Sequence, residues 1–147
     1  MAVSCNFVLV AKIAHIGDTK PGGIDESVWE KKFNTKGCFK GGYALLMFNI
    51  MALTYTTENV PVKINGNVIG NIRPTPGGTT TIGYPLFQSI CFHSTNLNDG
   101  ENLIRIEAPR FPASDKNPEK TPEKNKPVNL YDDFTLTDVV CFFQQSS

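Results

Sequence analysis

The chain has 147 residues, of which 14 are basic and 14 acidic, so its formal net charge is zero. This length fits one domain, residues 1–147, and is enough to bury a core. The balanced charge excludes the strongly basic surface that a duplex nucleic-acid binder needs, and it gives no attraction to anionic membranes. We therefore expect neither nucleic acid nor a membrane as partner.

The first segment, residues 3–15, alternates between apolar and polar side chains. This period of two predicts a half-buried strand whose apolar face carries Val3, Cys5, Phe7, Leu9, Ala11 and Ile13. The segment has no basic start and no continuous apolar run, so a cleaved signal peptide is not expected. The chain is then cytoplasmic when made, and release or assembly into a larger particle stays open.

Residues 17–42 are rich in turn formers and contain the sequence IDESVWEKKF. This piece fits either a short helix, capped by Asp25, or a loop. Residues 43–55 are apolar at odd and at even positions, which favours a strand covered on both faces. At 13 residues this stretch is too short to cross a bilayer, which needs about 20.

The clearest local signal lies at residues 60–72, where β-forming residues flank Asn65-Gly66. An Asn-Gly pair favours a type I′ turn, so the segment predicts a hairpin in which Val62 faces Ile69. Turn residues at 73–85 then lead into a strand predicted over 86–94.

A turn at residues 98–100 leads into a strand at 102–108, whose Ile104 and Ile106 are expected to face the core. The last predicted strand, 134–143, directs one set of apolar residues to one face: Phe134, Leu136, Val140 and Phe142. Asp138 interrupts this face, which predicts a bulge or an edge position.

Residues 109–130 form a loop of about 22 residues that holds five of the ten prolines. It offers few apolar groups to offset the entropy of ordering, so we interpret it as an excursion from the core. Six or more strands with few helical signals predict an all-β antiparallel sandwich.

Four cysteines occur at positions 5, 38, 91 and 141, without a CxxC pair. Their spacing does not resemble a zinc site. Reduced, buried cysteines are the simplest interpretation. If a disulfide forms, Cys5 and Cys141 are the pair to test, because terminal strands are often neighbours in sandwiches.

Two motifs, about 35 residues apart, carry a family resemblance. Asn65, Gly66 and Gly70 belong to the first, and Leu97, Gly100 and Asn102 to the second. In this order they resemble the galactose-binding-like jelly roll of carbohydrate-binding modules and of accessory sandwich domains in glycosidases. Asp133-Phe134 is similar to the start of the final strand in such modules. The resemblance implies a jelly-roll sandwich without catalytic activity of its own.

The sequence contains no nucleophile elbow, zinc-protease motif or phosphate-binding loop. We therefore expect no enzyme and no cofactor. Asp132 and Asp133 leave a glycosidase pair open, since such a pair needs two carboxyl groups about 5–10 Å apart. The resemblance also implies a structural calcium ion, for which Asp133 is the candidate ligand, against the simpler reading that both aspartates solvate the end of a loop.

Sugar binding needs an exposed aromatic ring together with directed polar groups. The candidate ligand-binding residues are Trp29, Tyr84, Asn129, Tyr131 and Asp132. The alternative is that the rings of Trp29 and Tyr131 plug the end of the sandwich. Two exposed rings in one cleft would favour a glycan site.

The leading hypothesis is a non-catalytic binding module, lectin-like, that recognises a glycan through loops at one end of the sandwich. The alternative is a structural subunit that self-associates as a homo-oligomer or decorates a larger complex through a protein surface. The apolar stretch at 43–55 and the long loop support this second hypothesis.

Overall fold

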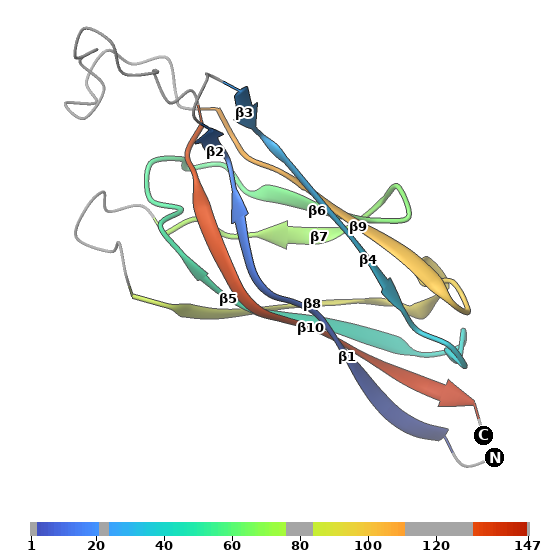
Figure 1. Ribbon diagram of the computed structural model, residues 1–147. Helices are drawn as coiled ribbons and strands as arrows, with labels where there is room; N and C mark the ends of the chain where they lie inside the picture. Colours follow the sequence, from blue (N-terminus) through green and yellow to red (C-terminus); the bar gives the residue numbers. More distant parts are fainter. Residues whose placement is uncertain (1–2, 21–23, 76–83, 111–130, 147) are drawn as a thin grey trace, which may run out of the picture.

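The computed structural model describes residues 3–20, 24–75, 84–110 and 131–146. These residues form two four-stranded antiparallel sheets and a small two-stranded ribbon. The first sheet has the strand order β1-β10-β5-β8 and the second has the order β4-β9-β6-β7. The two sheets lie face to face, and the ends of the described chain lie side by side (Figure 1). The expected antiparallel sandwich is confirmed.

The strands of the first sheet are β1 (Val3–Ile16), β5 (Tyr43–Met51), β8 (Leu86–His93) and β10 (Phe134–Ser146). Those of the second sheet are β4 (Val28–Asn34), β6 (Val60–Ile64), β7 (Asn67–Ile72) and β9 (Glu101–Glu107). The ribbon consists of β2 (Asp18–Lys20) and β3 (Ile24–Glu26). The described part contains one 3-10 turn, Ser94–Asn96, and no helix that is long and apolar enough to cross a membrane.

The core lies between the sheets and consists of one contiguous cluster of apolar side chains. Its largest fully buried members are Phe48, Phe134, Ile16, Leu46, Ile64, Ile72, Leu97, Ile104, Ile106 and Leu136. The expectation that Ile104 and Ile106 face the core is confirmed.

The segment IDESVWEKKF forms parts of β3 and β4 rather than the helix or loop that the sequence suggested. Its strand character comes from pairing over the whole length of β9, from Val28 opposite Glu107 to Asn34 opposite Glu101. Only Phe33 of β4 is fully buried, so the strand shows little of the alternation that reveals a half-buried strand.

The hairpin at Asn65-Gly66 forms as predicted, with φ angles of 51° and 84° at the two turn residues. Both angles are positive, as a type I′ turn requires. The predicted pair of Val62 and Ile69 is wrong, because a bulge between Val62 and Lys63 places Val62 opposite Gly70.

The predicted irregularity at Asp138 is confirmed as a bulge in β10, where Asp138 has a φ of 49°. The strand is central in its sheet rather than at an edge. Before the bulge the even-numbered residues of β10 face the core, and beyond it the odd-numbered residues do. Phe134 and Leu136 are buried as predicted, but Val140 and Phe142 face outward, and the buried residues beyond the bulge are Val139, Cys141 and Phe143.

A register shift between Leu9 and Ala11 accompanies this bulge in the neighbouring strand β1. The predicted apolar face of β1 does not face the core. Phe7, Leu9 and Ile13 are exposed, whereas Val10, Ala14 and Ile16 are buried.

All four cysteines are free. Cys5 is exposed on the outer side of β1, while Cys141 is buried on the inner side of β10, so this pair cannot form the disulfide that we singled out. Only Cys38 and Cys141 are buried as expected, and burial raises the pKa of the Cys141 thiol to about 12.

Candidate functional site

One end of the sandwich, which we call the loop end, carries most of the predicted site residues. Strands β4, β6, β8 and β10 begin there and β1, β5, β7 and β9 end there, as their antiparallel registers require (Figure 1). Trp29 lies at the beginning of β4, Tyr84 two residues before β8, and Tyr131 and Asp132 just before β10. Asn129 lies outside the described residues.

Asp132 is almost completely buried and connects three segments at the loop end. The backbone N–H groups of Tyr55 and Thr56 donate to its Oδ2 atom at 3.0 and 2.7 Å. Its own N–H donates to the Pro109 carbonyl oxygen at 2.9 Å. The carboxylate therefore accepts hydrogen bonds from backbone N–H groups between β5 and β6. It holds this end of the molecule in place and does not face solvent.

Burial has the largest effect on the pKa of the Asp132 carboxyl group. It raises the pKa of this carboxyl group above its ordinary value near 3.8, although the N–H groups of Thr56 and Tyr55 oppose the shift. Adjacent Asp133 raises the pKa further. The charged form is thus less favourable here than in water.

Tyr131 is half-buried against the core and pairs with Arg110 as an isolated β-bridge. The Arg110 guanidinium carbon lies 5.9 Å from the centre of the Tyr131 ring, within the range of a cation–π interaction. Sequence reasoning did not select Arg110, because it is distant from Tyr131 in the sequence and only the bridge brings the pair together. Most of the predicted excursion at 109–130, residues 111–130, lies outside the described residues.

Trp29 is opposite Ile106 in the register of β4 and β9, so its ring is on the core side of the second sheet. It is half-buried and packs against the core cluster. The rings of Trp29 and Tyr131 are therefore neither fully exposed nor fully buried. Both side chains pack against the core cluster.

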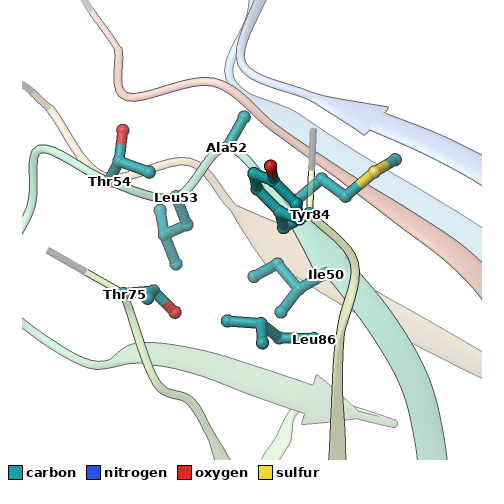
Figure 2. A pocket seen from close by; sticks show the side chains of 8 residues that line it. Ile50, Ala52, Leu53, Thr54, Thr75, Tyr84 and Leu86 are labelled. Carbon is teal, nitrogen blue, oxygen red and sulfur yellow. The ribbon is translucent and has the colours of Figure 1, made fainter. Parts of the chain in front are cut away.

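Tyr84 is the most exposed ring among the predicted site residues, at 70%. It borders a shallow hollow whose other lining residues are Ile50, Met51, Ala52, Leu53, Thr54, Thr75 and Leu86. Figure 2 shows the Tyr84 ring beside Ile50, with its hydroxyl group directed away from the middle of the hollow.

Two features of the hollow are energetically unfavourable for the isolated fold. Ala52 has a φ of 72°, in the left-handed region that non-glycine residues avoid. The hydroxyl group of Thr54 is buried and finds no hydrogen-bond partner among the described residues. Nothing in the sequence identified these two positions, because neither strain nor an unpaired hydroxyl has a sequence signature.

Asp133 is exposed and lies next to Gly17. Calcium needs six to eight oxygen ligands, usually with more than one carboxylate. In the described residues no three His, Cys, Asp or Glu side chains gather around a metal-sized position, and Oδ2 of Asp132 accepts backbone N–H groups. The role of Asp133 as a calcium ligand therefore stays a prediction.

No protein-family model matches the sequence, and a search of curated proteins gives no match. Among solved structures, the chain is similar to a β-porphyranase of glycoside hydrolase family 86 from the human gut bacterium Bacteroides plebeius. The TM-score is 0.54 at 13% sequence identity, and the match covers 99% of this chain. The chain matches only 21% of the length of that protein.

Two weaker similarities are to family 35 carbohydrate-binding modules. The module from Clostridium thermocellum gives a TM-score of 0.44 at 17% identity, with 95% of this chain and 98% of that one covered. The module from Cellvibrio japonicus gives 0.41 at 17% identity, with 81% and 64% covered. Together with the two antiparallel sheets, the porphyranase match confirms the sandwich fold that the two sequence motifs indicated.

Proposed function

We propose that this chain is a non-catalytic binding module that recognises a glycan at its loop end. The observation that carries the proposal is the exposed Tyr84 ring beside a hollow at the loop end that is lined by apolar side chains and by Thr75. Sugar rings present C–H faces that stack on aromatic rings, while their hydroxyl groups need nearby polar partners.

The polar partners proposed for the sugar come from the hollow and from other residues of the loop end. Thr75 lines the hollow and contributes a side-chain hydroxyl group. Tyr131 with its bound Arg110 is the second candidate contact, and Asn129 remains a predicted contact. Asp132 holds the backbone of Tyr55 and Thr56 in place and is a positioning residue in this scheme.

The fold supports the same ligand class, since the chain matches a part of an enzyme that belongs to a glycoside hydrolase family. A catalytic role for Asp132 and Asp133 is the less economical scheme, because the Asp132 carboxylate is buried and engaged by backbone donors. Asp132→Asn and Asp133→Asn variants that abolish a measured glycoside hydrolysis while remaining folded would contradict the proposed role.

The test is calorimetry on the glycans that bind in an array screen of neutral and acidic oligosaccharides. Tyr84→Ala should weaken binding about tenfold, which corresponds to about 1.4 kcal/mol. Tyr84→Phe keeps the ring and is the matched control, with an affinity close to that of the original chain. A folded protein that binds no glycan, or a Tyr84→Ala variant of undiminished affinity, would overturn the proposal.

A further inference from the structure

Two neighbouring rows of outward-facing residues on the first sheet are almost entirely apolar. The registers of β1, β10, β5 and β8 place outward-facing residues in rows across all four strands. One row consists of Phe7, Phe142, Leu45 and Cys91, and the next of Leu9, Val140, Met47 and Ser89. Seven of these eight positions are apolar and none is charged. We call these two rows the apolar face.

Further apolar residues flank the apolar face at its margins. Tyr43 and Cys5 lie on the side of the chain ends, and Ile13 and Phe87 lie on the side of the loop end. Two exposed charged residues, Lys12 of β1 and Asp138 at the bulge of β10, lie between the apolar face and Ile13.

The second sheet shows what a solvated outer face looks like in the same molecule. There, Arg105 donates to Glu30 at 2.6 Å and to Glu107 at 2.8 Å, and Lys32 forms an ion pair with Glu101 at 2.9 Å. Antiparallel sheets that face water on one side carry polar residues on that side. The first sheet departs from this rule in the two rows of the apolar face, which cross all four strands, so this part of its outer face is suited to a partner.

The apolar face and its margins expose a large apolar area. Phe7 and Leu9 in the two rows, and Ile13, Tyr43 and Phe87 at the margins, are between 53% and 68% exposed. Taking roughly 200 Å² for a fully exposed aromatic side chain and slightly less for Leu and Ile, these five leave about 600 Å² in water. With its margins, the apolar face therefore reaches at least the upper end of the ~300–600 Å² of the largest patch on a typical monomer, and most of the ~800 Å² per partner of a standard interface.

We propose that the apolar face binds the same face of a second copy of this chain, giving a two-fold symmetric dimer. A two-fold contact pairs a surface with itself, so a charge near the axis meets its own copy and a charge elsewhere needs an opposite charge on the same face. The two rows contain no charged residue, and the net charge of the chain is zero, so two copies meet without repulsion. A glycan does not fit these rows, because Ser89 supplies their only side-chain hydroxyl group.

Sheet-on-sheet contact gives this dimer a defined geometry. Two sheets pack face to face at about 10 Å, with side chains of each filling gaps in the other. In both rows the larger side chains lie on β1, β10 and β5, and the small residues Cys91 and Ser89 lie on the edge strand β8. This surface is independent of the loop end, so the dimer does not depend on the proposed glycan site.

The first experiment is sedimentation velocity on the full chain from about 1 to about 100 µM. We expect a dimer that dissociates on dilution. Leu9→Lys, which puts a charge on each side of the interface, should raise the dissociation constant at least about tenfold. Val68→Lys is the matched control, because Val68 is 56% exposed on β7 of the second sheet, against 53% for Leu9 on β1. It should leave the dissociation constant unchanged.

The second experiment uses the unmodified chain and its own cysteines. Cys91 lies in the apolar face and Cys5 at its margin, and both are exposed in the single chain, whereas Cys38 and Cys141 are buried. Alkylation of Cys91 by iodoacetamide should slow about tenfold between the dilute and the concentrated sample. Cys38 and Cys141 should remain unmodified in both samples, which shows that the protein stays folded.

A chain that is monomeric at about 100 µM, with equal Cys91 alkylation in both samples, would overturn the proposal and assign the face to a different protein. A dimer that Val68→Lys disrupts and Leu9→Lys does not would also overturn it.

Discussion

Asn65 donates a side-chain hydrogen bond to the Oδ1 atom of Asn102 over 2.8 Å. These two residues belong to the two turn motifs on which the family resemblance was based. The same oxygen accepts the backbone N–H of Asn98 at 2.6 Å, and Asn102 Nδ2 donates to Thr35 Oγ1 at 2.8 Å. The two motifs therefore form one hydrogen-bonded cluster at the end of the sandwich opposite the loop end.

Replacing Asn102 by Ala should strongly destabilise the fold. Asn102 is buried, and its loss leaves the Asn98 N–H and the Thr35 hydroxyl without this partner. We expect the free energy of unfolding in urea to fall by about 2–4 kcal/mol. Asn98→Ala, at an exposed position in the same turn, is the control and should cost about 1 kcal/mol or less. Equal losses for the two variants would contradict a central role for Asn102.

Gly70→Ala should overpack the space between the sheets. A Cβ atom at this position would lie 2.4 Å from Cγ2 of Ile90. Overpacking of this kind costs about 1–3 kcal/mol, seen as a lower urea midpoint. Gly66→Ala is the control. A Cβ atom there meets nothing within 4 Å, so this variant measures the backbone cost of replacing a glycine at positive φ without a steric cost. In an Ile90→Ala background the penalty of Gly70→Ala should shrink, and an unchanged penalty would show that Ile90 is not its cause.

Substitutions of Asp138 test whether the bulge in β10 requires a left-handed conformation at this residue. Its φ of 49° is accessible to Asp and Gly but unfavourable for a β-branched residue. Asp138→Gly should therefore leave the thermal midpoint nearly unchanged, whereas Asp138→Val should cost about 1–2 kcal/mol. If both variants melted at the same temperature, the left-handed conformation would not be required in solution.

Asp132 should give the stability of the protein a specific pH dependence. Burial raises its pKa in the folded state, so this group stabilises the fold in its protonated form, and that contribution is lost as the pH rises through the folded pKa. The free energy of unfolding of the original chain, relative to that of Asp132→Asn, should increase between pH 7 and pH 4. Urea denaturation at several pH values measures this difference, and a decrease toward pH 4 would mean that the N–H groups outweigh burial.

Much of the strand pattern could be predicted from the sequence, because alternation and turn chemistry are local signals. The Asn65-Gly66 hairpin and the bulge at Asp138 follow from residue types alone. What the sequence could not provide is the consequence of a bulge for the residues beyond it. After Asp138 the positions that face inward shift by one residue, so Val139 and Cys141 are buried in place of Val140 and Phe142.

The apolar alternation of β1 also led to a wrong prediction of which side of this strand faces the core. A pattern shows that one side of a strand is apolar but not that this side faces the core, and here Phe7 and Leu9 lie outside. The site was only partly predictable for a similar reason. Asp132 was selected as a ligand contact, but tertiary hydrogen bonds from Tyr55 and Thr56 engage it inside the fold.

The bridge between Arg110 and Tyr131, with the hydrogen bond from Asp132 N–H to Pro109, fixes both points where the chain leaves and rejoins the sandwich. Because the two attachment points are held together by the scaffold, the cost of a longer insert grows only slowly, by about 0.6 kcal/mol for each doubling of its length. The stretch between these residues is therefore a natural graft position, where a foreign peptide could be displayed on an intact β-sandwich.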